Sequence, residues 1–422
     1  MQRKTRSILP LHIAFTIILA SATAWAQEKS PPTPAEATPA PKPSFGYDGG
    51  FFLRTDDDKY KLKIGGQFQT RFEYFNEDTD GVDPKYAVSI PRARLKISGN
   101  VFTPALRFEV MPDFGKGSPT LKDTWVDGEL LQGWLILRVG QTKRPFSRQQ
   151  MTSSSSLEMN DTAITDKYFG AGYDLGVMFH NDYGKSPAFE WAFGFFNGTG
   201  DKPWFKSKVE TDLATADDGT QSATTTIDEK KTAFTNIPDR FRPAIVARVG
   251  YNYGGIKAYS EADLEGGPLR LGIGLSGQAD LDTDGQRKGA VKGDLDFILK
   301  AHGFSLSGAG YVSSAEKADK DWVDQELSAL GAHFQVGYVV SGLVEPVLRY
   351  AIVDPTDTYA DTDFFKFNRE QEVLGGLSFY FFKHNAKWQT EGGAALRNVN
   401  DDGGGTSDHT DTVVRTQFQL AF

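Results

Sequence analysis

The feature of this sequence that most constrains its fold is a strict alternation of apolar and polar residues through long segments. The first such segment runs from residue 60 to residue 74. Alternate residues of a β-strand point to opposite faces, so the pattern predicts a strand with one apolar and one polar face. The apolar face carries Tyr60, Leu62, Ile64, Phe68, Phe72 and Tyr74, and the polar face carries Lys61, Lys63, Gln67, Gln69, Arg71 and Glu73. This register is longer than a soluble strand usually needs, and it is typical of a strand with lipid on one side and water on the other.

The same alternation recurs along the rest of the chain. Turn residues such as Asp284-Gly285 separate the alternating runs, as in a series of hairpins. The count is about sixteen strands, an even number that is typical of porins. The sequence therefore predicts an all-β fold, a transmembrane antiparallel β-barrel. Further strands are expected at 92–101, 106–110, 121–130, 134–143, 173–183, 188–197, 241–253, 269–281, 290–302, 304–313, 327–340, 343–353, 367–382, 386–398 and 410–422.

The first residues have the pattern of an export signal. A basic start precedes an apolar run at 8–20, and Ala24-Trp25-Ala26 provides a small-x-small cleavage site, so residues 1–26 are predicted to be a signal peptide. The apolar run is too short to span a bilayer. Residues 27–44 are rich in proline and alanine and predict a periplasmic linker. The barrel is then expected to occupy residues 45–422.

The last strand indicates where the protein resides. Phe418, Leu420 and the terminal Phe422 share one face. A final strand that ends in an aromatic residue resembles the sorting signal that the outer-membrane barrel assembly machinery recognises. We therefore expect Phe422 to engage that machinery, outer-membrane lipid to surround the barrel, and the location to be the outer membrane of a Gram-negative bacterium.

Composition excludes several classes of function. The formal net charge of −9 argues against a nucleic-acid partner. The chain has no cysteine, which removes disulfides and thiolate catalysis, and its six histidines lack zinc-like spacing. The serine run at 153–156 lacks the Gly-x-Ser-x-Gly elbow of a nucleophile. The sequence therefore predicts no enzymatic activity, no metal site and no cofactor.

Two polar segments are too long to be hairpin turns. Residues 143–172 separate two alternating strands, and such a loop can fold into a barrel and narrow its lumen. We interpret this segment as a constriction loop that carries Lys143, Arg144 and Arg148. The second segment, 198–240, suits a long extracellular loop.

Basic residues on the inward face are the candidate anion-binding and pore-lining residues. A ring of one sign in a narrow pore influences ions more than the net charge of the protein does. The alternative is ordinary lumen electrostatics, in which Glu109 and other acids pair with these cations. The candidates are Arg71, Arg92, Arg94, Arg107 and Arg138 on strands, with Lys143, Arg144 and Arg148 in the loop.

Several motifs in the first half resemble one known family. They are Phe51, Lys61-Leu62-Lys63-Ile64-Gly65-Gly66, Arg92-Ala93-Arg94-Leu95, Leu121-Lys122-Asp123, Val139-Gly140-Gln141, Pro145-Phe146, Thr152-Ser153-Ser154 and Tyr173-Asp174-Leu175-Gly176-Val177. Over residues 51–197 the chain resembles the phosphate-selective porins O and P. The resemblance implies a trimeric porin of sixteen strands, whose third loop folds into a lumen where arginine and lysine line a path for phosphate. Of the basic positions that the family implies, Arg92 carries over, whereas Gln67, Pro91 and either Gln150 or Met151 stand at the others.

These observations favour a porin that passes small anions, phosphate or related oxyanions, through a water-filled pore narrowed by a basic loop. Two alternatives remain open at this point. One is a general or sugar-oligomer porin with little anion selectivity. The other is a secreted soluble all-β binding protein or enzyme.

Overall fold

The computed structural model describes residues 43–79, 81–117, 119–198, 207–215, 221–229, 243–281, 288–317, 325–356, 367–400 and 405–422. They belong to one compact unit that spans Pro43–Phe422. The predicted signal peptide at 1–26 and nearly all of the predicted linker at 27–44 lie outside the described residues, as does most of the predicted loop at 198–240.

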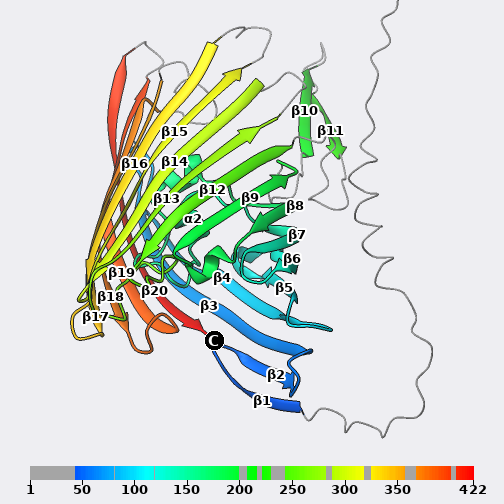
Figure 1. Cartoon of the computed structure of the whole chain (residues 1–422). Coiled ribbons are helices and arrows are strands. Elements are labelled where there is room, and N and C mark those ends of the chain that lie inside the picture. The colour runs from blue at the N-terminus through cyan, green and yellow to red at the C-terminus, as the bar shows by residue number, and fades with distance from the viewer. Residues whose placement is uncertain are drawn as a thin grey trace, which may run out of the picture. The chain divides into compact units, whose positions relative to one another are not determined.

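Sixteen antiparallel strands of the described residues form a closed barrel (Figure 1). Neighbours in the chain pair with each other, β9 pairs with β12, and β20 pairs with β3 to close the ring. The predicted fold class is therefore confirmed. The barrel strands are β3 (Lys61–Asn76), β4 (Lys85–Asn100), β5 (Leu106–Asp113), β6 (Thr120–Leu131), β7 (Leu135–Lys143), β8 (Tyr173–His180), β9 (Phe189–Phe196), β12 (Ala244–Tyr253), β13 (Arg270–Asp280), β14 (Lys288–Ala301), β15 (Phe304–Lys317), β16 (Gln325–Tyr338), β17 (Val344–Pro355), β18 (Arg369–Tyr380), β19 (Ala386–Asn400) and β20 (Thr406–Ala421).

The remaining elements are short. Two hairpins lie outside the ring order: β1 (Pro43–Tyr47) with β2 (Phe51–Thr55), and β10 (Ser207–Thr215) with β11 (Gln221–Glu229). Among the described residues, the helices are α2 (Arg148–Met151) and α3 (Ile164–Phe169), with single 3₁₀ turns η1 (Gly115–Gly117) and η2 (Tyr183–Lys185). Within the described part of the chain, no helix has the length and apolar character needed to cross a membrane.

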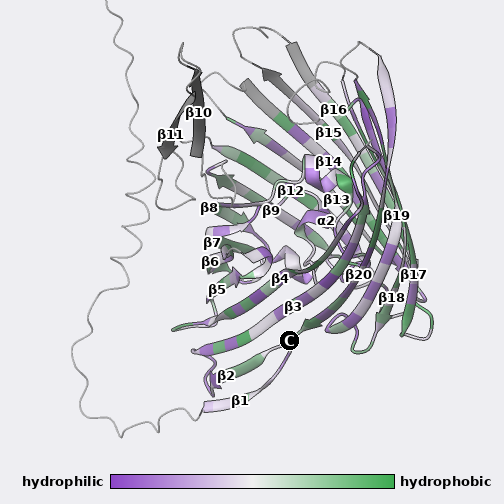
Figure 2. Cartoon of the chain, turned by 180° about the vertical axis from the view of Figure 1, so that it is seen from behind, coloured by the Kyte–Doolittle hydropathy of each residue, from purple (hydrophilic) through white to green (hydrophobic). Residues whose placement is uncertain are grey.

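The barrel wall has its polar face inside and its apolar face outside, which is the reverse of a soluble protein. Polar and charged side chains point inward, and Arg248 and Lys300 are among the largest fully buried side chains. Outward side chains are apolar and exposed, as in the row of Val249, Leu275 and Leu295 on three adjacent strands. Figure 2 shows this alternation as bands of opposite hydropathy along each strand. The alternation that predicted the strands thus separates a polar interior from an apolar exterior.

Strand β4 begins well before the expected start at residue 92, and Pro91 explains the difference. Gln69 of β3 pairs with Arg92, whereas Arg71 pairs with Ser89, so β4 holds one extra residue at Pro91. Proline has no N–H to donate, and bulges are where a strand accommodates it. The proline that interrupts the sequence pattern therefore marks a bulge within a longer strand.

The ring closes where the chain ends. The backbone of Phe422 exchanges two hydrogen bonds with Gly66, with N–O distances of 2.8 and 3.0 Å. A Cβ on Gly65 would lie 2.5 Å from the Phe422 carbonyl oxygen, so this close approach requires glycine. Strand β3 extends past the end of β20, and β2 pairs with that extension at 61–64. The rings of Phe51 and Phe422 lie 6.3 Å apart, which joins the hairpin to the last residue.

Replacing Leu275 with arginine tests the outward apolar face. Leu275 is 55% exposed in the middle of β13, so an arginine there meets the surroundings of the barrel and not its lumen. Arginine on the lipid face of a barrel lowers stability by about 2–4 kcal/mol near the bilayer midplane. We expect a loss of this size in the free energy of unfolding of Leu275→Arg, measured by denaturant titration in lipid vesicles. The control is Leu275→Ile, which we expect to change stability little; equal stability of the arginine variant would contradict a lipid-facing position.

Candidate functional site

The segment between β7 and β8 lies inside the barrel. It contains α2 and α3, and Figure 1 shows α2 within the ring of strands. Helix α3 contacts β15, β16 and β17, which lie across the barrel from the strands that flank the segment. We call residues 144–172 the inner loop. The inner loop therefore crosses the lumen from one wall to the other.

A buried ion-pair cluster anchors the start of the inner loop. Arg148 Nε donates to Asp296 Oδ1 at 2.9 Å, and the Arg148 backbone N–H donates to Asp296 Oδ2 at 3.0 Å. Arg248 donates to the same two oxygens from β12, at 2.6 and 3.0 Å. The three side chains are at most 5% exposed. A carboxylate shared by two buried guanidiniums fixes the loop to the wall.

A second set of polar contacts anchors the middle of the inner loop. Glu158 is 2% exposed, and both its carboxylate oxygens accept hydrogen bonds, from Ser305 of β15 and from Gln335 of β16. Its backbone carbonyl accepts from Ser378 and Gln389, at 2.8 and 2.7 Å. These contacts join the loop to β15, β16, β18 and β19.

The end of the inner loop is anchored by aromatic packing. The ring of Phe169 stacks on Tyr311 of β15, with centroids 5.2 Å apart. Tyr168 packs edge-on against Phe367, and its hydroxyl donates to Glu370 at 2.5 Å. Phe169 is 1% exposed and belongs to a cluster of buried apolar side chains that includes Val246 and Val353 of the wall. The inner loop is thus held at its start, middle and end.

A cavity of about 360 Å³ lies between the inner loop and the wall of β4–β7. We call it the Lys143 cavity. Among the described residues, its lining includes four cations, Arg94, Lys96, Arg138 and Lys143, and two carboxylates, Glu109 and Asp123. Ser153 and Ser155 of the inner loop add hydroxyl groups. Cations thus outnumber carboxylates among the described residues of this lining.

The cations of the Lys143 cavity differ in how far acids neutralise them. Lys96 pairs with Glu109 at 2.8 Å, Arg94 with Asp113 at 2.8 Å, and Arg138 with Asp127 at 2.7 Å.

Lys143 has neutral partners instead. Its Nζ donates to the backbone carbonyls of Gln150 and Thr152, at 2.7 and 2.8 Å, and lies 5.7 Å from the ring of Tyr173. Within the described part of the chain, no carboxylate forms an ion pair with it. Lys143 is therefore the cation of this cavity that forms no direct ion pair among the described residues, and Asp123 and Asp166 attract it from a greater distance.

Three other cations that were predicted as site residues lie outside the lining of the Lys143 cavity. Arg144 is 9% exposed and lies 3.9 Å from Asp174, and Arg148 is buried in the cluster at Asp296. Arg107 on β5 pairs with Asp127 at 3.3 Å and with Asp182 at 2.9 Å. None of these three cations is among the described residues that line the Lys143 cavity. An anion-binding role for them stays a prediction.

Arg71 and Arg92 come together on one carboxylate of the inner loop. Arg71 Nη1 lies 2.6 Å from Asp161 Oδ2, and Arg92 Nη2 lies 2.8 Å from Asp161 Oδ1. The sequence predicted both arginines on the inward face, but nothing in the loop's polar composition distinguished Asp161 as their partner.

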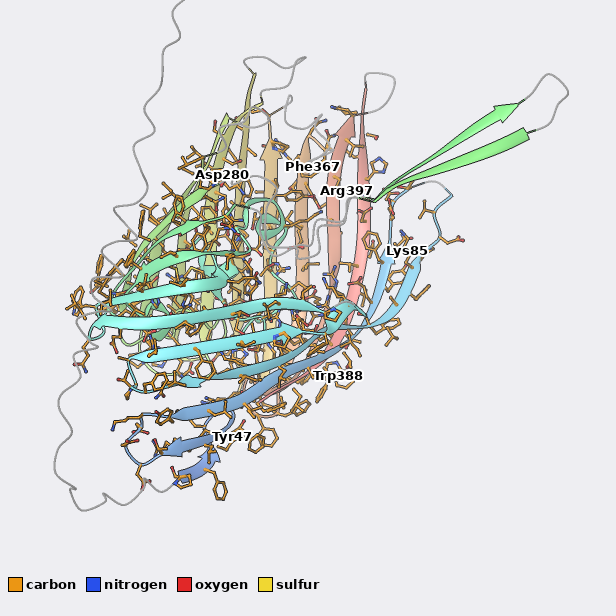
Figure 3. The ribbon with its side chains drawn as sticks, turned by 90° about the vertical axis from the view of Figure 1, so that its right-hand side faces the viewer. Tyr47, Lys85, Asp280, Phe367, Trp388 and Arg397 are labelled. Atoms are coloured by element: carbon orange, nitrogen blue, oxygen red, sulfur yellow. The ribbon has the colours of Figure 1, made fainter. Side chains whose placement is uncertain are left out.

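A second cavity, of about 550 Å³, lies beside α3 and β18–β20. We call it the Arg397 cavity. Its lining combines apolar Phe75, Phe367 and Leu374 with charged side chains. Among the described residues these are the cations Lys167, Arg397 and Arg415 and the carboxylates Glu77, Glu370, Glu372 and Asp411. Figure 3 shows Phe367 and Arg397 near the end of the barrel opposite Tyr47. The sequence analysis missed these two arginines, although the alternation rule that found Arg92 would also have placed them on the inward face.

Breaking the ion pair of Arg148 tests the anchor of the inner loop. Removing one partner of a buried pair leaves an unpaired charge and typically lowers stability by about 3–5 kcal/mol. We expect Arg148→Gln to lower the free energy of unfolding by about 3 kcal/mol, since Arg248 still neutralises part of Asp296. The single-channel current should also become noisier, because the start of the inner loop is then free to move.

The matched control is Arg54→Gln. Arg54 pairs with Asp58 at 3.4 Å on the surface, with side chains 46% and 56% exposed. Such surface pairs contribute about 0–1 kcal/mol. Equal effects of the two substitutions on stability would show that Arg148 is not an anchor.

Comparison with known proteins agrees with this architecture. The family described as "Phosphate-selective porin O and P" matches residues 62–422. No match was found among curated proteins.

Solved porin structures share the fold. An anion-selective porin from Comamonas acidovorans is 14% identical, with a TM-score of 0.54 over 86% of this chain and 99% of that one. The outer membrane channel DcaP of Acinetobacter baumannii is 14% identical, with a TM-score of 0.55 over 87% and 99% of the two chains. OmpT of Vibrio cholerae in its trimer form is 11% identical, with a TM-score of 0.50 over 86% and 100%.

The family match covers most of the barrel and excludes the soluble all-β alternative. The expected location in the outer membrane is confirmed, and the expectation of a channel and not an enzyme is confirmed by the family. With the closed barrel and the match over residues 62–422, the chain belongs to the phosphate-selective porins O and P, outer-membrane porins of Gram-negative bacteria.

Proposed function

We propose that this porin passes small anions, phosphate and related oxyanions among them, through the Lys143 cavity. The observation that carries the proposal is the charge of Lys143, which faces this cavity and contacts only neutral carbonyl oxygens among its hydrogen-bond acceptors. A cation whose charge is not cancelled lowers the energy of an anion in a narrow, water-filled passage. The inner loop would act as the constriction, because it confines solutes to the remaining space.

Two further observations support an anion path. Cations outnumber carboxylates among the described residues of the Lys143 cavity. Phosphate selectivity is in the name of the family to which the chain belongs, and a porin of the same fold is described as anion-selective. Ser153 and Ser155 offer hydroxyl donors to an oxyanion that passes the loop.

The second candidate is a general or sugar-oligomer porin with little anion selectivity. The ion pairs of Arg94 and Arg138 favour it, because paired cations act on a passing ion much less than free ones. Tyr173 and Tyr183, which also line the cavity, could stack on a sugar ring. The two candidate functions predict different ion selectivities, so a measurement of the reversal potential separates them.

The test is Lys143→Glu in a planar bilayer with a KCl gradient. Two unit charges about 6 Å apart in water interact by about 0.7 kcal/mol, and the substitution changes the charge by two units. We expect the ratio of chloride to potassium permeability, obtained from the reversal potential, to fall roughly 3- to 10-fold. Titration of phosphate into the wild-type channel should block its chloride current.

The matched control is Lys59→Glu, which reverses a lysine of the turn between β2 and β3. Lys59 is 58% exposed, pairs with Asp57 and is not among the described residues that line either cavity. We expect its reversal potential to equal that of the wild type. A weakly selective wild type that Lys143→Glu leaves unchanged would favour the general or sugar porin.

We further propose that the porin forms a homotrimer. The support is the trimer form recorded for OmpT of Vibrio cholerae, which has the same fold. Native mass spectrometry of the detergent-extracted protein should give three times the mass of one chain. A mass of one chain under conditions that keep the barrel folded would contradict the trimer.

A further inference from the structure

Two arginines, Arg71 and Arg92, hold the Asp161 carboxylate in the way that they would hold a bound anion. Arg71 holds one carboxylate oxygen at 2.6 Å and Arg92 holds the other at 2.8 Å. Arg71 Nη2 and Arg92 Nη1 also reach toward the backbone carbonyl of Asn160, at 3.3 and 3.4 Å. Two guanidiniums on separate oxygens of one anion are also how arginines bind a free carboxylate or phosphate.

The inner loop supplies one carboxylate, Asp161, to the two arginines of this contact. Asp161 is the carboxylate that pairs with Arg71 and with Arg92 among the described residues, so two cations share one anion. Their remaining side-chain partners are neutral: Arg71 donates to Gln417 and Arg92 donates to Gln69. If Asp161 lost its charge, two arginines would face the lumen with no acid between them.

The site lies between the two cavities. On β3, Gln67 lines the Lys143 cavity and Phe75 lines the Arg397 cavity, and Arg71 is midway, about 13 Å from each along the strand. On β4, Arg92 is the next inward residue after Arg94, which lines the Lys143 cavity. An anion that travels from one cavity to the other along this wall would reach Arg71 and Arg92.

The inner loop does not need Asp161 to hold its position. Arg148, Glu158 and Phe169 already fix its start, middle and end to the wall. Asp161 is also more accessible than these anchors, because its side chain is 33% exposed, whereas Glu158 is 2% exposed. Because other contacts hold the inner loop, the Asp161 carboxylate can separate from Arg71 and Arg92 while the loop stays in place.

We propose that Asp161 is an internal competing ligand, which occupies an oxyanion site made by Arg71 and Arg92 and thereby lowers the affinity of the pore for passing oxyanions. The site takes anions that present two equivalent oxygens, such as phosphate, better than it takes chloride. This inference rests on the proposed anion path for its physiological meaning, but binding at the site is measured independently of current. The competition lets an oxyanion bind transiently and then leave, as conduction requires.

The experiment is calorimetric titration of inorganic phosphate into the full-length porin in detergent, in a buffer without competing oxyanions. We expect Asp161→Asn to bind phosphate about tenfold more tightly than the wild type does, because a charge-assisted contact of about 1.4 kcal/mol no longer has to be broken. Chloride affinity should rise less. Adding Arg71→Gln and Arg92→Gln to Asp161→Asn should abolish the gain.

The matched control is Asp354→Asn, an equal change of charge at another arginine. Asp354 pairs with Arg369 at 3.0 Å, and neither residue is among the described residues that line either cavity. We expect its phosphate affinity to stay close to that of the wild type. An equal gain in the two variants would mean a general electrostatic effect and would overturn the proposal.

Other outcomes are also decisive. Unchanged or weaker phosphate binding by Asp161→Asn, with the barrel folded on an unheated gel, would overturn the proposal. Asp161→Ser serves as a second variant with a shorter side chain, and failure of both to fold would make Asp161 a structural anchor instead. If Asp161→Asn gains affinity while the wild type shows no anion selectivity in the bilayer, the inference stands and the proposed function fails.

Discussion

The structure depends on one constraint: in apolar surroundings every backbone N–H and C=O needs a partner within the protein. A sheet meets this constraint only when it has no free edge, so β20 must pair with β3. Closure then assigns each side chain to one of two environments by its position in the strand. Apolar Val249, Leu275 and Leu295 occupy the outside, and the wall that remains for the inside is polar. The polar lumen is thus a consequence of closure and not a separate design.

A polar lumen requires an unusual way of holding a loop. In a soluble protein a crossing segment packs through apolar contacts, but the inner loop meets a wall of charges and amides. It is held by Arg148 on Asp296 and by Glu158 on Ser305 and Gln335. Buried Phe146 at its start and Phe169 at its end add apolar packing. Several cations that suggest an anion path in the sequence are therefore also loop anchors or partners of acids. Lys143 differs from them because its ammonium group donates to backbone carbonyls and forms no direct ion pair among the described residues.

The fold could be predicted from the sequence to a large extent, because alternation along a strand is local. The inward positions of Gln69 and Arg71 and the outward positions of Phe68 and Phe72 follow from period two alone, and the structure agrees. Pro91 was harder, since a proline in an alternating segment fits either the start of a strand or a bulge within one. The site was less accessible to prediction. The meeting of Asp161 with Arg71 joins residues 90 positions apart, and the route of the inner loop through the lumen determines it. No local pattern encodes that route.

The pairing of β20 with β3, which closes the barrel, affects how the chain folds. The strand that closes the ring, β20, follows all the other barrel strands in the sequence and pairs with the first of them, as in the contact of Gln69 with Gln419 across 350 positions. The hairpin of β1 and β2 then covers the part of β3 that β20 does not reach, and Phe51 rests on Phe422. Contacts between such distant residues make loop closure slow. Until β20 pairs with β3, the chain is an open sheet with two unpaired edges, which other chains could join, so the unclosed chains must be kept apart from one another.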